Sequence, residues 1–106
     1  MQHLQPEELL IWKNENKPHL LVDIREEYEV AICTLDGMHI PMEHVIEKYP
    51  SLPKENPIVF HCNSGKRSDA LVYMIEKKFP GDVIYSLAGG VQGYAEQCAP
   101  EIKCSL

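Results

Sequence analysis

The residues best suited to chemistry form one short loop, Cys62-Asn63-Ser64-Gly65-Lys66-Arg67, with Ser68 directly after it. An apolar run precedes this loop and a helical pattern follows it, so we expect it to join a strand to a helix. Such a loop points backbone N–H groups at one spot, and the helix start adds further unsatisfied N–H groups and its positive dipole end. An anion is stabilised at that spot. Because the anion can be the thiolate of Cys62 itself, the loop predicts a nucleophilic cysteine.

The other loop positions suit the same chemistry. Gly65 permits a tight turn and a close approach of the backbone to the bound atom. Ser64 and Ser68 can donate hydroxyl hydrogen bonds, while Lys66 and Arg67 add positive charge to an otherwise acidic chain. We therefore predict that residues 63–68 bind a small anionic group on or near Cys62.

His61 precedes the cysteine and is a candidate general base. Neighbouring residues of a strand point to opposite faces of the sheet, so its ring is not directed toward Cys62. We interpret His61 as a core residue.

Short apolar runs alternate with helical stretches along the chain, which predicts an α/β fold with a five-stranded parallel sheet and helices on both faces. The pattern places strands at 19–23, 38–40, 57–61 and 83–87, and helices at 6–12, 26–32, 42–49, 68–79 and 91–98. In such sheets ligands bind beyond the carboxyl ends of the strands, and Cys62 falls at such an end.

Length and charge limit the remaining possibilities. A chain of 106 residues fits one domain over 1–106, and its net charge of −6 argues against nucleic acid as the main partner. No apolar run is long enough to cross a membrane, and Met1 to Pro6 lack the pattern of a signal peptide, so we expect a cytoplasmic protein with no membrane partner.

The four cysteines are Cys33, Cys62, Cys98 and Cys104. In a cytoplasmic protein we expect mostly reduced thiols and no disulfide framework. None of them forms a CxxC pair, so no metal site is predicted. Cys33 lies in an apolar stretch and is interpreted as a buried small hydrophobe, with a role in sulfur relay left open.

Taken together, the motifs resemble the rhodanese-like family. The loop matches its CxxGxR pattern, and the other matching segments are Asp23-Ile24-Arg25-Glu26 with Glu29, Gly37 with Ile40-Pro41, and Leu87-Ala88-Gly89-Gly90-Val91. Tyr94 stands where the family usually has Trp. The likeness covers nearly the whole chain and is greatest to the rhodanese domains of MoeB/ThiF-type adenylyltransferases, through 29–33 and 90–96.

The resemblance implies a sulfurtransferase that carries sulfane sulfur as a persulfide on Cys62. The donor would be thiosulfate or a protein persulfide, and the acceptor cyanide, a thiol or a ubiquitin-like sulfur carrier. No cofactor is implied besides the covalent persulfide. Asp23 and Arg25, with Glu29, are interpreted as an ion-pair support near the strand end, bordering the substrate mouth. Arg67 either holds the anion or supports the loop from outside.

Two other functions remain open. Cysteine phosphatases and arsenate reductases have a similar loop, but the phosphatase pattern HCxxGxxR places Arg where this chain has Ser68, and here Arg67 comes one residue earlier. The shorter loop favours a single sulfur atom over phosphate. A catalytically silent binding module of the same fold usually lacks the cysteine. Asn63, Thr34 and Asp36 depart from the family pattern, and Asn63 places the donor preference in doubt.

Overall fold

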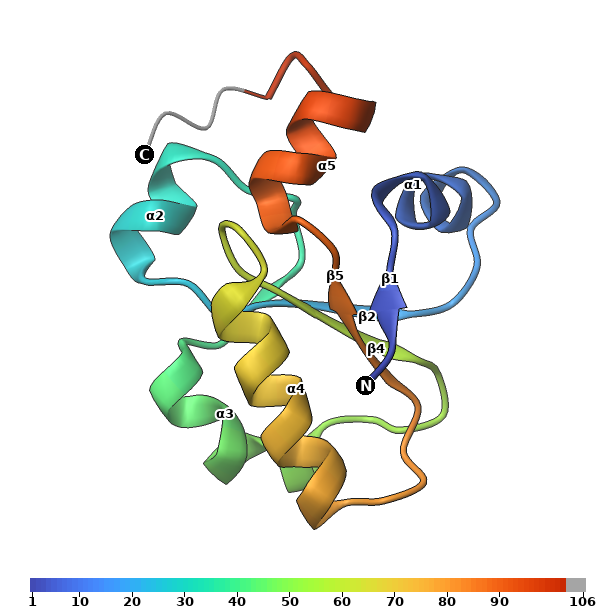
Figure 1. The fold of residues 1–106 in the computed structure, drawn as a ribbon, viewed down its shortest axis with the longest axis vertical. Helices are drawn as coiled ribbons and strands as arrows, with labels where there is room; N and C mark the ends of the chain where they lie inside the picture. Colours follow the sequence, from blue (N-terminus) through green and yellow to red (C-terminus); the bar gives the residue numbers. More distant parts are fainter. Residues whose placement is uncertain (103–106) are drawn as a thin grey trace.

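The computed structural model describes residues 1–102 (Figure 1). The elements in chain order are β1 (His3–Leu4), α1 (Pro6–Asn14), β2 (Leu20–Asp23), α2 (Glu27–Ile32), β3 (Met38–His39), α3 (Met42–Lys48), the 3-10 turn η1 (Tyr49–Ser51), β4 (Ile58–His61), α4 (Lys66–Lys78), β5 (Ile84–Leu87) and α5 (Gly90–Cys98).

The strands form a five-stranded sheet in the order β1-β5-β4-β2-β3, with every pair parallel. The predicted α/β fold is therefore confirmed. The fifth strand is β1, which contains two residues and which the sequence pattern did not locate. It pairs with β5, and the N–H of Ala88 donates to the carbonyl of Leu4 at 2.9 Å.

Helices cover both faces of the sheet, and each face has its own apolar core. Side chains of β4 alternate between them: Ile58 and Phe60 pack with α3, η1 and α4, while Val59 packs with α1 and α5. Figure 1 shows the pair α3 and α4 away from the pair α1 and α5. Because both faces are buried, all four residues of β4 are buried and its sequence is apolar without interruption up to His61.

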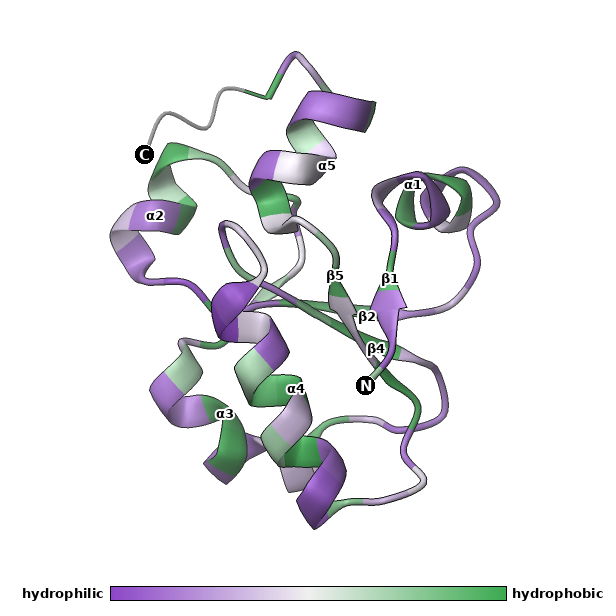
Figure 2. Cartoon of the chain, viewed as in Figure 1, coloured by the Kyte–Doolittle hydropathy of each residue, from purple (hydrophilic) through white to green (hydrophobic). Residues whose placement is uncertain are grey.

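The predicted helix after the cysteine loop begins earlier than expected. Gly65 is its N-cap and α4 starts at Lys66, so Lys66 and Arg67 belong to its first turn instead of the loop. Figure 2 shows this first turn as strongly hydrophilic. Lys77 and Lys78 lie in the last turn, where cations favour the helix dipole. Within residues 1–102, no helix is long and apolar enough to cross a membrane.

Candidate active site

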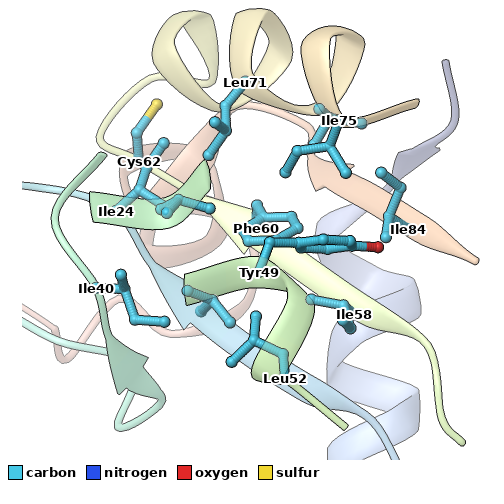
Figure 3. Packing of buried hydrophobic residues seen from close by; sticks show 13 residues of the cluster. Ile24, Ile40, Tyr49, Leu52, Ile58, Phe60, Cys62, Leu71, Ile75 and Ile84 are labelled. Carbon is cyan, nitrogen blue, oxygen red and sulfur yellow. The ribbon is translucent and has the colours of Figure 1, made fainter. Parts of the chain in front are cut away.

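Cys62 lies directly after β4, at the carboxyl end of the strand, and only 1% of its surface is exposed. Its sulfur points away from the apolar side chains below it (Figure 3). The N–H of Gly65 donates to the Cys62 Sγ atom at 3.1 Å, the kind of contact that stabilises a sulfur anion. Gly65 has a φ of +104°, a backbone conformation that side chains other than glycine rarely adopt. The loop therefore folds back over the sulfur as the sequence pattern predicted.

The start of α5 holds the loop in place. The N–H of Val91 donates to the carbonyl of Cys62 at 2.9 Å, and the N–H of Gln92 donates to the carbonyl of Asn63 at 3.0 Å. These are N–H groups of the first helical turn, which have no partner within the helix. The backbones come this close because Gly90 has no Cβ: one built there would lie 2.5 Å from both carbonyl oxygens.

The Arg67 side chain is paired with Glu29 of α2. The guanidinium donates to both carboxylate oxygens at 2.9 and 2.8 Å, a bidentate contact. This pairing is the first cause of the lowered pKa of Glu29 and of the raised pKa of Arg67. Two roles were predicted for Arg67: to hold the anion or to support the loop from outside. Its pairing with Glu29 of α2 agrees with the second role. Glu29 was missed as its partner, because it was grouped with Asp23 and Arg25.

The remaining side chains of the 63–68 segment differ in exposure. Ser64 and Lys66 are exposed, and Asn63 is partly buried. The Asn63 Oδ1 atom is buried and has no hydrogen-bond partner among the described residues. Ser68 is fully buried beside the thiol, with its Oγ atom 3.7 Å from the Cys62 Sγ atom.

Asp23 and Arg25 form a buried ion pair beneath the site. Arg25 donates to the Asp23 carboxylate from its backbone N–H and its guanidinium, with the shortest contact at 2.8 Å. Burial acts to raise the pKa of Asp23, but these hydrogen bonds outweigh it and hold the pKa below its usual value. Arg25 is 0% exposed, so the expectation that this pair borders the substrate mouth is wrong.

His61 lies in the core, as interpreted from the strand alternation. It is 0% exposed, and neither ring nitrogen has a hydrogen-bond partner among the described residues. Its Nε2 atom lies 4.0 Å from the Asp23 Oδ2 atom. Burial lowers the pKa of His61 to about 4, so the ring is neutral near pH 7.

A line of polar side chains that the sequence did not indicate leads from Cys62 to the surface. It passes from Ser68 to Ser86 of β5 and then to Asp69 and His3. Asp69 follows Ser68 directly, but nothing in the sequence places Ser86 or His3 next to it.

The other cysteines lie away from this loop. Cys33 follows the end of α2 and is 8% exposed, which agrees with its interpretation as a buried small hydrophobe. Its carbonyl accepts a hydrogen bond from Arg25 at 2.6 Å. Cys62 and Cys98 are free thiols. Cys104 lies outside the described residues.

Curated relatives of this chain are parts of larger proteins. The adenylyltransferase and sulfurtransferase MOCS3 of Drosophila ananassae is 30% identical over 96 residues, which are 83% of this chain and 21% of that protein. The probable adenylyltransferase/sulfurtransferase MoeZ of Mycobacterium tuberculosis is 28% identical over 102 residues, with coverages of 93% and 26%. The chain thus spans about a quarter or less of either relative.

Solved structures share the fold at low identity. A rhodanese-related protein from Thermoplasma volcanium has a TM-score of 0.80 at 22% identity and covers 99% of this chain and 100% of its own. A rhodanese-like domain protein from Staphylococcus aureus has a TM-score of 0.79 at 23% identity, and each chain is covered completely. The rhodanese-like domain family matches residues 5–97, which include β2 to β5 and the Cys62 loop. The chain therefore belongs to the rhodanese-like domain family.

Proposed function

We propose that this domain is a sulfurtransferase in which Cys62 carries sulfane sulfur as a persulfide. The observation that supports this most directly is the position of the Cys62 Sγ atom. It lies at the start of α4, where the N–H of Gly65 reaches it at 3.1 Å. The names of the relatives, adenylyltransferase and sulfurtransferase, agree with this chemistry.

The reaction has two halves. The Cys62 thiolate attacks the outer sulfur of a donor, for which thiosulfate or a protein persulfide is proposed. A sulfur–sulfur bond to Cys62 forms, the bond within the donor breaks, and sulfite or a thiolate leaves with the electron pair. The outer, anionic sulfur is then held by N–H groups of the loop and the first turn of α4.

In the second half-reaction a nucleophile removes the outer sulfur and Cys62 returns to a thiolate. Cyanide serves as the acceptor in an assay, and a thiol or a ubiquitin-like sulfur carrier is proposed as the acceptor in the cell. With Arg67 paired to Glu29, Lys66 is the exposed cation at the loop that can attract an anionic donor.

The placement of Arg67 also favours sulfur over phosphate. A phosphatase loop needs an arginine directed at the oxygens of its substrate, whereas both terminal nitrogens of Arg67 are held by Glu29. The fixed donors that remain for an anion are backbone N–H groups. These suit a single sulfur atom better than a tetrahedral phosphate.

The test is mass spectrometry of the protein after incubation with thiosulfate. Wild type is expected to gain the mass of one sulfur atom on Cys62 and to lose it on addition of cyanide. The C62S variant is expected to gain nothing. Cys98 is also a free thiol, so C98S is the matched control and is expected to load as wild type does.

Three results would contradict the proposal. One is cyanide-labile sulfur on C62S at the wild-type level. Another is a phosphate ester that wild type hydrolyses well and C62S does not, which would favour a phosphatase. The third is absence of loading by every donor tested, with Cys62 intact, which would favour a silent binding module.

A further inference from the structure

A continuous line of hydrogen bonds joins the buried Cys62 to the protein surface. Its Sγ atom contacts the Ser68 Oγ atom at 3.7 Å, and Ser68 contacts the Ser86 Oγ atom at 2.7 Å. Ser86 donates to the Asp69 Oδ1 atom at 2.6 Å, and the His3 Nε2 atom lies 3.1 Å from the same oxygen. Both serines are 0% exposed, whereas the Asp69 side chain is 41% exposed.

The number of hydrogens available gives this line a direction. A carboxylate only accepts, so Ser86 must give its single hydroxyl hydrogen to Asp69. The 2.7 Å contact between the serines then needs the hydrogen of Ser68. A longer contact of 3.2 Å from Ser68 to the carbonyl of Gly65 competes for that hydrogen. The Ser68 oxygen is left to accept from the thiol of Cys62, so every contact in the line has a hydrogen when the thiol keeps its proton.

Loss of the proton from Cys62 disturbs this arrangement. A thiolate needs a donor, and Ser68 is the hydroxyl next to it. If Ser68 turns its hydrogen to the sulfur, the contact with Ser86 must be made by the hydrogen of Ser86. Asp69 then loses its 2.6 Å hydrogen bond. Ionised Asp69 and ionised Cys62 therefore compete for the same two hydrogens.

We propose that Ser68, Ser86 and Asp69 set the proton state of Cys62, with the Asp69 carboxylate favouring the thiol in the resting domain. The inference deepens the proposed sulfur transfer, since it concerns the same nucleophile. Asp69 is a positioning residue in this scheme, because it acts through two serines and touches no substrate. The carboxylate opposes the N–H of Gly65, which favours the thiolate.

The other charged groups near Cys62 do not replace Asp69 in this role. Arg67 on α4 is charged, but both of its terminal nitrogens bind the Glu29 carboxylate on α2, which offsets that charge. His61 on β4 is neutral near pH 7, because burial lowers its pKa to about 4. His3 on β1 acts on Cys62 only through Asp69.

The test uses D69N and measures the rate at which iodoacetamide alkylates Cys62 as a function of pH, read from the Cys62 peptide by mass spectrometry. An asparagine amide can donate to Ser86, which turns both serine hydrogens toward the sulfur. The pH midpoint of alkylation is expected to fall by about one unit. One unit is the effect of roughly one hydrogen bond. Alkylation below the midpoint is expected to be about threefold faster, because a thiolate of lower pKa is also a weaker nucleophile.

The matched control is E76Q, which removes the same charge from the same helix at a side chain outside the line. Its midpoint is expected to stay close to wild type. S86A interrupts the line at its centre and is expected to shift the midpoint in the same direction as D69N. The double variant should shift no further than the larger single shift, since both changes break one connection.

The inference is overturned if the midpoint of D69N is unchanged or raised, or if E76Q shifts it as much. Iodoacetamide needs no sulfur donor, so this result is separate from that of the proposed function. If wild type never loads sulfur but D69N shifts the midpoint, the sulfurtransferase is refuted and the effect of Asp69 on Cys62 is supported. If wild type loads sulfur but D69N shows no shift of the midpoint, the sulfurtransferase is supported and the role of Asp69 is refuted.

Discussion

Replacement of Gly90 by alanine is expected to damage the Cys62 loop from a helix that contributes no side chain to it. Gly90 has a φ of +60°, and a Cβ there would lie 2.5 Å from the carbonyl oxygens of both Cys62 and Asn63. Both are backbone atoms, so neither can rotate away as a side chain does. The same carbonyls accept the hydrogen bonds that fix the loop to α5, at 2.9 and 3.0 Å.

The magnitude follows from a comparison with Gly81. That glycine also has a positive φ, +99°, but a Cβ there would meet nothing within 4 Å. G81A should lose about 1 kcal/mol of unfolding free energy, the backbone term alone. G90A has that term and must also move the loop by about 1 Å, which weakens both hydrogen bonds at about 1 kcal/mol each. Its total loss should be about 3 kcal/mol.

Two measurements separate these effects. Urea unfolding gives the stability of each variant, and the rate of sulfur loading from thiosulfate reports the geometry of the loop. At a temperature where all variants are folded, G81A should load at the wild-type rate. G90A should load about 100-fold more slowly, since a displacement near 1 Å costs about that much in a positioned reaction.

Either of two results would refute this role of Gly90. In the first, G90A loads sulfur as fast as G81A, which would mean that the loop does not depend on its contact with α5. In the second, the two variants lose equal stability, which would mean that the close approach of the backbones is absent in solution.

Two further predictions concern the charged and buried groups around the loop. E29Q removes the carboxylate that pairs with Arg67 and should lower stability by about 1 kcal/mol, a modest value because Arg67 is 38% exposed. E29Q should also slow sulfur loading. E27Q, at an exposed position of the same helix, should change neither the stability nor the loading rate. Equal loading rates of E29Q and E27Q, measured where both variants are folded, would contradict this prediction. Because His61 has a folded pKa near 4 and an unfolded pKa near 6.5, stability should be full above about pH 6.5 and fall by about 3 kcal/mol toward pH 4. In H61L, the free energy of unfolding measured with urea should change less between about pH 6.5 and pH 4. An unchanged slope would show that the burial of His61 is not the cause of this pH dependence.

The sequence predicts well those features that depend on neighbouring residues. The apolar run before Cys62, the glycine three positions later and the basic first turn of the next helix are all local, and they predict the strand, the turn and the helix together. The parallel sheet follows from the alternation of strands and helices.

Features that depend on contacts between distant segments could not be predicted. β1 has two residues and becomes a strand only because β5 lies beside it. Ser86 and Asp69 are 17 positions apart, and their hydrogen bond exists only once β5 packs against α4. The partner of Arg67 was missed for the same reason, because α2 lies 38 positions earlier and its orientation is set by tertiary packing.

The position of Arg67 also changes the meaning of the loop spacing. From the sequence, an arginine one residue short of the phosphatase position indicates a smaller cradle around the bound anion. In the structure, the arginine leaves the cradle altogether, since both of its terminal nitrogens bind Glu29. In the proposed sulfur transfer, the atom held by the loop would therefore meet backbone N–H groups in place of a guanidinium fork. Backbone donors fix a single small anion without the bidentate geometry that a phosphate needs. In the proposed sulfur transfer, the spacing therefore matters because Arg67 pairs with Glu29 and leaves backbone N–H groups to hold the sulfur.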